Sequence, residues 1–162
     1  MKNIIYILSI LFITSCASSP QECETKANGF IDGVEGQVTM GEQSSVEVFN
    51  QIDKAWAELD YETLKTFVAE GAEMRFADGR VGVGPDEFIE IIKAWVSEVE
   101  NEDGNEYTWN TDYAFSLAVT SIDGDWVNAQ FTSTHTNPDS ELEAEVFYEF
   151  YHIVDGKIQE WS

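Results

Sequence analysis

The sequence is poor in cysteine, proline, histidine and basic residues, and these shortages exclude several classes of protein. Two cysteines in 162 residues exclude a disulfide-rich scaffold, and no Cys/His spacing typical of a zinc site is present. Eight Lys and Arg against 31 Asp and Glu give a formal net charge of −23 at pH 7. Such a surface repels phosphate backbones, so nucleic acid is not expected as a partner. Phosphate loops, dinucleotide fingerprints and nucleophile elbows are missing, so no cofactor is expected.

The composition of the chain is typical of one globular domain. Hydrophobic residues make up 43% of the chain and aromatic residues 13%, which is too rich for a disordered protein. The acid clusters at 98–103 and 141–145 lack the spacing of a calcium loop, so no metal site is expected. We interpret the acidic excess as a solvated surface, with a cationic partner or a saline environment as the functional alternative.

The first residues are typical of a secretory signal. A short basic start, Met1-Lys2-Asn3, precedes an apolar run over 4–13. This run is shorter than the roughly 20 residues of a membrane-spanning helix. Ile13-Thr14-Ser15-Cys16 then resembles the lipobox of bacterial lipoproteins. The resemblance implies cleavage of residues 1–15, acylation of Cys16 and a lipid anchor in the bacterial cell envelope, with an ordinary cleaved signal as the alternative.

The segment that follows the lipobox is expected to be a tether. In one common sorting rule for bacterial lipoproteins, Ala17 rather than Asp after the cysteine favours the outer over the inner membrane. Residues 16–43 contain four Gly, two Ser and one Pro with scattered charge, which predicts a flexible tether with short extended pieces at 30–31 and 37–40. Cys23 has no partner within the chain once Cys16 is acylated, so it either stays free or links two chains.

The folded domain is expected over 44–162, with its helices first. Ser44 and Glu47 have the spacing of a capping box, and an apolar stripe follows to Leu59. Asp60 opens a second, shorter helix that Gly71 ends, and Pro85 opens a third. A hairpin around Asp78-Gly79 separates the last two helices.

In the second half of the chain, apolar and polar residues alternate with a period of two, which predicts strands. They are expected at 107–111, 113–120, 126–136, 142–154 and 157–161. Helices followed by a meander of strands indicate an α+β domain, with three helices on one face of a mostly antiparallel sheet.

Three motifs together resemble the nuclear transport factor 2-like superfamily, in its SnoaL-like branch. They are the helix junction at 55–64, the "DG…G-x-[DE]E" entry into the third helix at 76–87, and the closing hairpin at 154–158. The resemblance implies a cone-shaped fold: a strongly curved sheet wrapped against the helices, with an apolar pocket in its mouth. Many members also dimerise through the outer face of the sheet.

Steroid-isomerase chemistry is not supported by this resemblance. The position of that branch's catalytic base falls on Phe76, and the position of its oxyanion-hole tyrosine falls on Ile52. Neither side chain transfers a proton or donates a hydrogen bond. The third position, a carboxyl in the long strand, falls on Tyr148 or Glu149. Whether the protein is an enzyme is left open, with the balance against it.

The candidate polar groups of the pocket are His135, Tyr148 and His152, each assigned to an inward face by alternation. The two histidines are expected roughly 30 Å apart along the hairpin, which excludes a shared metal. Core packing or rim hydrogen bonds are the structural alternatives for all three. The expected lining is Ile52, Trp56, Met74, Phe76, Trp95, Phe131 and Phe150.

Three functions remain open from the sequence. The first is an envelope lipoprotein that binds a small apolar or amphipathic ligand, which requires a roomy pocket. The second is a SnoaL-like enzyme of the isomerase, cyclase or dehydratase type, which requires a pocket-facing group with a shifted pKa. The third is a dimeric interaction module, which requires a filled cone and an exposed aromatic patch at Trp126, Phe147 and Tyr151.

Overall fold

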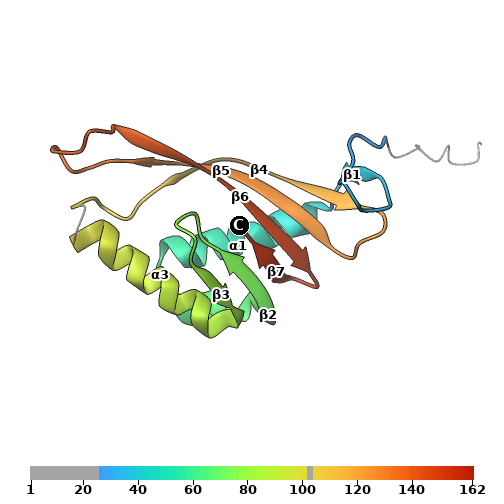
Figure 1. Ribbon diagram of the computed structural model, residues 1–162, viewed down its shortest axis with the longest axis horizontal. Helices are drawn as coiled ribbons and strands as arrows, with labels where there is room; N and C mark the ends of the chain where they lie inside the picture. The colour runs from blue at the N-terminus through green and yellow to red at the C-terminus, as the bar shows by residue number, and fades with distance from the viewer. Residues whose placement is uncertain (1–25, 102–103) are drawn as a thin grey trace, which may run out of the picture.

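The computed structural model describes residues 26–101 and 104–162. Within these two ranges, three helices pack against one seven-stranded sheet (Figure 1). The lipobox, Cys16 and Cys23 lie outside the described residues, so the lipid anchor stays a prediction. None of the helices in the described ranges is long and apolar enough to cross a membrane.

The order of elements agrees with the expected α+β class. The helices are α1 (Gln43–Ala57), α2 (Tyr61–Thr66) and α3 (Gly84–Asn101). The strands are β1 (Val38–Met40), β2 (Val68–Arg75), β3 (Val81–Val83), β4 (Asn110–Val119), β5 (Asp125–Thr134), β6 (Ala144–Val154) and β7 (Lys157–Trp161). In the sheet they lie in the order β1-β4-β5-β6-β7-β2-β3, and every neighbouring pair is antiparallel except β2 with β7. The predicted fold class is confirmed.

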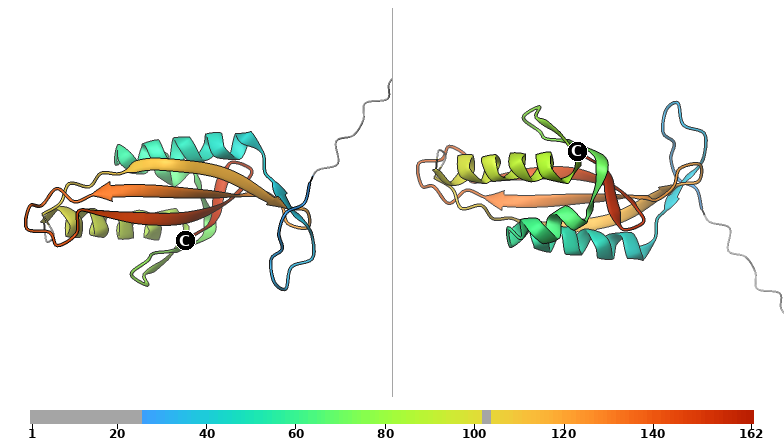
Figure 2. Two further views of the ribbon diagram at one scale, coloured as in Figure 1. Left: turned by 90° about the horizontal axis from the view of Figure 1, so that it is seen from above. Right: turned by 90° about the horizontal axis from the view of Figure 1, so that it is seen from below.

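The helices lie on one side of the long strands β4, β5 and β6 (Figure 1). Seen from above, α1 runs along the β4 side and α3 along the β6 side (Figure 2). The chain ends near the centre of the molecule, between these layers. The core between helices and sheet is aliphatic and aromatic, and its largest fully buried side chains are Tyr151, Phe49, Phe88, Ile52, Leu64 and Met74.

The start of the domain differs from the expectation in two ways. First, the extended piece expected at 37–40 forms β1 and pairs with β4, so the sheet begins at Val38, inside the stretch predicted as a tether. Second, the expected capping box does not form, because the N-cap is Glu42, two residues before Ser44, and Glu42 makes no side-chain cap. Asp125 of β5 takes over this role. Its Oδ2 accepts hydrogen bonds from the Glu42 N–H at 2.9 Å and the Ser45 hydroxyl at 2.6 Å.

The second helix is shorter than expected. It ends at Thr66, and Gly71, predicted to stop it, lies within β2 at an irregularity of the pairing with β7. The turn glycine at 124 behaves as predicted. It has φ +80°, and a Cβ there would lie 2.3 Å from the Ile153 carbonyl oxygen, so only glycine fits.

The faces of β6 are reversed relative to the expectation. In the β5–β6 ladder Val127 pairs with Tyr151 and Phe131 with Phe147, so Tyr151 and Phe147 share the inner face. Tyr148 and Phe150 project from the outer face, where they are 61% and 48% exposed. The acidic run at 141–145 made the odd positions look solvent-facing, but along β6 they turn inward.

Candidate functional site

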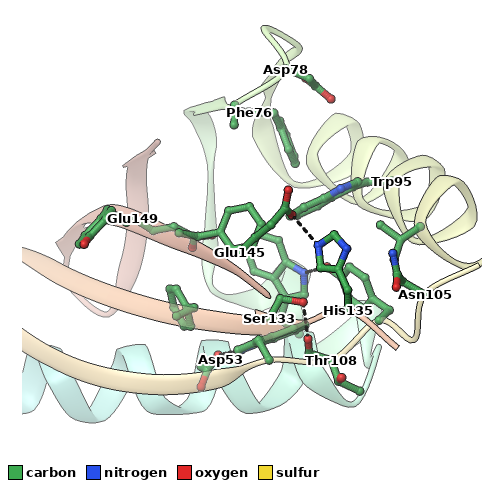
Figure 3. Close-up of a pocket in the computed structure, with 18 of the residues that line it drawn as sticks. Asp53, Phe76, Asp78, Trp95, Asn105, Thr108, Ser133, His135, Glu145 and Glu149 are labelled. Atoms are coloured by element: carbon green, nitrogen blue, oxygen red, sulfur yellow. Dashed lines mark hydrogen bonds and ion pairs between the residues drawn. The ribbon is translucent and has the colours of Figure 1, made fainter. Parts of the chain in front are cut away.

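An open cavity of about 750 Å³ lies between the inner face of β5 and β6, the helices α1 and α3, and the segment at 105–109 (Figure 3). Its volume falls within the range of small-molecule sites, roughly 300–1,000 Å³. Aromatic side chains form a large part of its wall: Trp56, Phe76, Trp95, Tyr107, Trp109, Phe131, Phe147, Tyr151 and Trp161. The cone is therefore hollow, which removes the filled interior that the interaction-module hypothesis required.

Glu149 is a half-buried carboxyl in this wall. The Tyr151 hydroxyl donates to its Oε2 at 2.5 Å, and the Trp161 indole N–H donates to the same oxygen at 3.0 Å. Burial disfavours the carboxylate more than these two donors favour it, and the nearby Asp53 adds repulsion, so the pKa of Glu149 rises to about 7. The pKa of Tyr151 is raised well above its usual value by burial and by Glu149. Near neutral pH, Glu149 is thus present in both protonation states.

Asp53 forms a second carboxyl of the cavity, on α1. It accepts hydrogen bonds from the Trp109 indole N–H at 2.9 Å and from the Thr111 hydroxyl at 2.8 Å. Each of these two carboxyls is thus held by one indole and one hydroxyl. Beside them the Trp56 N–H donates to the Tyr107 hydroxyl at 2.7 Å, and burial raises the pKa of that phenol.

The mouth of the cavity carries a histidine. His135 Nδ1 lies 2.6 Å from the Ser140 hydroxyl, and its Nε2 lies 3.5 Å from Oε2 of Glu145. Figure 3 shows this side chain between Glu145 and Asn105. Ser133, also in the wall, donates its hydroxyl to the Thr108 carbonyl at 2.8 Å.

The structure divides the expected lining residues into three groups. Trp56, Phe76, Trp95 and Phe131 line the cavity as expected. Ile52 and Met74 are fully buried in the core and are not part of the wall. Phe150 lies on the outer face, because the two faces of β6 are reversed.

The three candidate polar residues do not come together. Only His135 points into the cavity. Tyr148 borders the cavity, but its side chain shares the outer face with Gln130. His152 stacks on Trp126 with ring centroids 4.1 Å apart, and both rings lie on the outer face. Among the described residues, no group of three or more His, Cys, Asp and Glu side chains is placed to hold a metal ion.

The interaction-module hypothesis placed its aromatic patch on the wrong residues. Phe147 and Tyr151 line the cavity, and only Trp126 of the three faces outward. The exposed aromatic residues of the outer face are Tyr113, Phe115, Tyr148 and Phe150.

The two carboxyls were missed as site residues, although the sequence held a signal for each. Asp53 is a lone acid within the apolar stripe of its helix, one turn from Phe49 and from Trp56. Glu149 is one of the two residues on which the third steroid-isomerase position falls, and the inward turn of β6 selects it over Tyr148. The other two positions hold Phe76 and Ile52 in apolar surroundings.

The chain was compared with protein-family models, curated proteins and solved structures. Neither protein-family models nor curated proteins gave a match. Solved structures do match, among them three at 10–14% sequence identity. A candidate polyketide cyclase from Xanthomonas campestris pv. campestris matches with a TM-score of 0.52, 14% identity, and 74% of this chain and 88% of that one covered.

Two further structures extend the comparison. A candidate ketosteroid isomerase from Kribbella flavida matches with a TM-score of 0.55 and 10% identity, with 74% and 75% of the chains covered. An NTF2-like protein of unknown function from Cytophaga hutchinsonii matches with a TM-score of 0.50 and 10% identity, with 72% and 85% covered. Identities this low establish shared architecture only. The chain therefore has the nuclear transport factor 2-like fold that its three motifs predicted.

Proposed function

We propose that this protein is a lipid-anchored envelope protein whose cone-shaped cavity binds a small apolar or amphipathic molecule. The observation that supports the binding role is the open cavity of about 750 Å³, whose surface is mostly apolar and rich in aromatic side chains. Sites of this kind bury most of a ligand's surface against apolar side chains and orient it with a small number of hydrogen bonds. Here those bonds would come from Glu149, Asp53 and His135.

The anchor is supported by the sequence alone. The lipobox at 13–16 and the apolar run before it fit a cleaved and acylated precursor. The intact mass of protein extracted from membranes tests this part. A chain that begins at Cys16 and carries acyl groups is expected, and an unmodified chain would contradict it.

Filling the cavity is expected to abolish binding of an apolar probe. Ser133 lines the cavity on β5, and its neighbour Thr132 projects from the opposite face of the same strand. A Ser133→Trp variant places an indole in the cavity, and we expect affinity for the neutral fluorophore N-phenyl-1-naphthylamine to fall at least about tenfold. Thr132→Trp is the matched control and should bind as the wild type does. Equal affinity in the two variants, with the wild-type fold retained, would contradict a ligand site in the cone.

One observation favours a second candidate function, proton-transfer catalysis. A carboxyl with a pKa of about 7 inside an apolar cavity suits a general acid or base, and its group is Glu149, not the three residues expected from sequence. Some proteins that share this fold are named as cyclases or isomerases. If this chain catalyses enolisation, it should speed the exchange of ketone α-hydrogens with deuterated water. Glu149→Gln should then slow exchange about 10²-fold or more, as measured by NMR. No acceleration by the wild type over a range of cyclic ketones would remove this candidate.

A further inference from the structure

The charges around the cavity are unbalanced. Five carboxylates contribute to its lining, Asp53, Asp78, Glu106, Glu145 and Glu149, against one guanidinium, that of Arg75. Arg75 is already paired with Glu73 beside it on β2, and Asp78 is paired with Arg80. The guanidinium therefore does not neutralise the carboxyls deeper in the cone.

Asp53 and Glu149 have no cationic partner among the described residues. Their hydrogen bonds come from Trp109, Thr111, Tyr151 and Trp161, which are all neutral. Both donors to Glu149 end on Oε2, which leaves Oε1 available to a ligand. Both carboxyls are half-buried, where a nearby cation would stabilise the charged form, and the described residues supply none.

The remaining wall of the cavity is the kind of surface that attracts an organic cation. The faces of Trp, Tyr and Phe rings carry negative potential, and cages of such rings bind quaternary ammonium groups. Edge-to-face contacts hold the rings in place, with Trp95 and Tyr107 5.7 Å apart and Tyr107 and Trp109 5.3 Å apart. The net charge of −23 on the whole chain adds a field that concentrates cations near the mouth.

We propose that the ligand of this cavity is an organic cation, an apolar molecule with an ammonium group that the aromatic wall surrounds and that Glu149 and Asp53 neutralise. This inference rests on the proposed function, because it names the chemical class of the ligand at the same site. The ammonium group supplies the positive charge that the two carboxyls lack in the empty protein.

The inference predicts a sign for the pH dependence of binding. The titratable groups that act on Glu149 are Asp53 from α1, Tyr151 from its own strand and Tyr107 from the segment before β4, and none of them is a cation at neutral pH. A bound cation favours the carboxylate, so binding releases the proton and affinity rises as pH rises through about 7. A neutral apolar molecule desolvates Glu149 further, so its affinity falls or stays level over the same range.

Two isosteric probes separate these cases. Benzyltrimethylammonium and neopentylbenzene differ only in the exchange of a cationic nitrogen for carbon, and both can be measured by displacement of N-phenyl-1-naphthylamine from the whole protein at fixed ionic strength. From pH 6 to pH 8 we expect the affinity for the cation to rise about tenfold. The affinity for neopentylbenzene should not rise. Glu149→Gln should remove the pH dependence for the cation, and Glu160→Gln, an exposed change of the same charge on β7, should leave it intact.

The outcomes distinguish this inference from the proposed function. If neopentylbenzene displaces the fluorophore but the cation does not, or if the affinity for the cation is level or falls with pH, the cavity is a ligand site and the cationic ligand is excluded. A cationic ligand is equally excluded if Glu149→Gln keeps the wild-type pH dependence. If neither probe binds, and the fluorophore itself does not bind, the proposed function fails as well.

Discussion

Glu149→Gln is expected to stabilise the folded protein at pH 8 by about 3 kcal/mol. The folded state raises the pKa of Glu149 from 4.5 to about 7, and each pKa unit corresponds to about 1.36 kcal/mol. Between pH 4.5 and 7 the folded protein retains a proton that the unfolded chain has lost. The free energy of unfolding therefore falls as pH rises through this window, and the full loss is present above pH 7. An uncharged amide keeps an acceptor for Tyr151 and Trp161 and does not titrate.

Urea denaturation at pH 5 and pH 8 measures this effect. At pH 5 the wild-type carboxyl is largely protonated, so the two proteins should differ little there. Glu160→Gln corrects for the general loss of one negative charge from an acidic chain, since Glu160 is exposed on the neighbouring strand. A Glu149→Gln variant that is less stable than the wild type by the same amount at both pH values would show that the carboxyl is a structural anchor.

Trp161→Ala should remove a large part of the stability margin, with a loss of about 3–5 kcal/mol. Trp161 is 3% exposed, and its ring lies 4.8 Å from Phe76, 5.4 Å from Trp56 and 5.7 Å from Phe88, centroid to centroid. It thus joins α1, α3 and the β2–β3 hairpin to the end of the sheet. Truncation leaves a cavity among rigid rings and removes the indole donor of Glu149.

Thermal or urea unfolding of Trp161→Ala is compared with that of Trp126→Ala. Trp126 is the same residue type, half-buried on the outer face, where it stacks on His152. Its loss exposes no core, so a distinctly smaller destabilisation is expected. An equal loss in the free energy of unfolding for the two variants would contradict the role of Trp161 in holding the core together.

The order of elements was predictable because each depends on local signals. The three helices have apolar residues at helical spacing, and Asp78-Gly79, Asp123-Gly124 and Asp155-Gly156 mark the turns of the hairpins. These signals act within a few residues, so they predicted an α+β domain and the succession of helices and strands along the chain. The boundaries at Gly71 and Ser44 failed because long-range contacts decide them, namely the β2–β7 pairing and the cap from Asp125.

The face of β6 could not be predicted because both of its faces carry aromatic residues. Alternation alone assigns Tyr148 and Phe150 as readily inward as Phe147 and Tyr151. The pairing register settles the choice, because it sets Phe147 opposite Phe131 on the buried face of β5. The error placed Glu149 on the solvent side, where a carboxylate is expected, and so hid a carboxyl whose pKa the cavity raises.

The raised pKa of Glu149 favours a role for this carboxyl in the cavity. Desolvation raises the pKa of Glu149, and this lowers the free energy of unfolding at neutral pH. A glutamine would fill the same space without that loss. Natural proteins keep such groups at binding and catalytic sites. Together with the aromatic wall and the open mouth, this explains why an acidic group lies among Tyr151, Trp161 and Asp53.

The most direct test of a cation-binding cone is an NMR titration of the Glu149 side-chain carboxyl, without and with benzyltrimethylammonium. In the empty protein the carboxyl is predicted to titrate near pH 7, and the bound cation should lower that midpoint. A carboxyl that titrates near its ordinary value of 4.5, and that does not respond when a probe occupies the cone, would contradict the central claim.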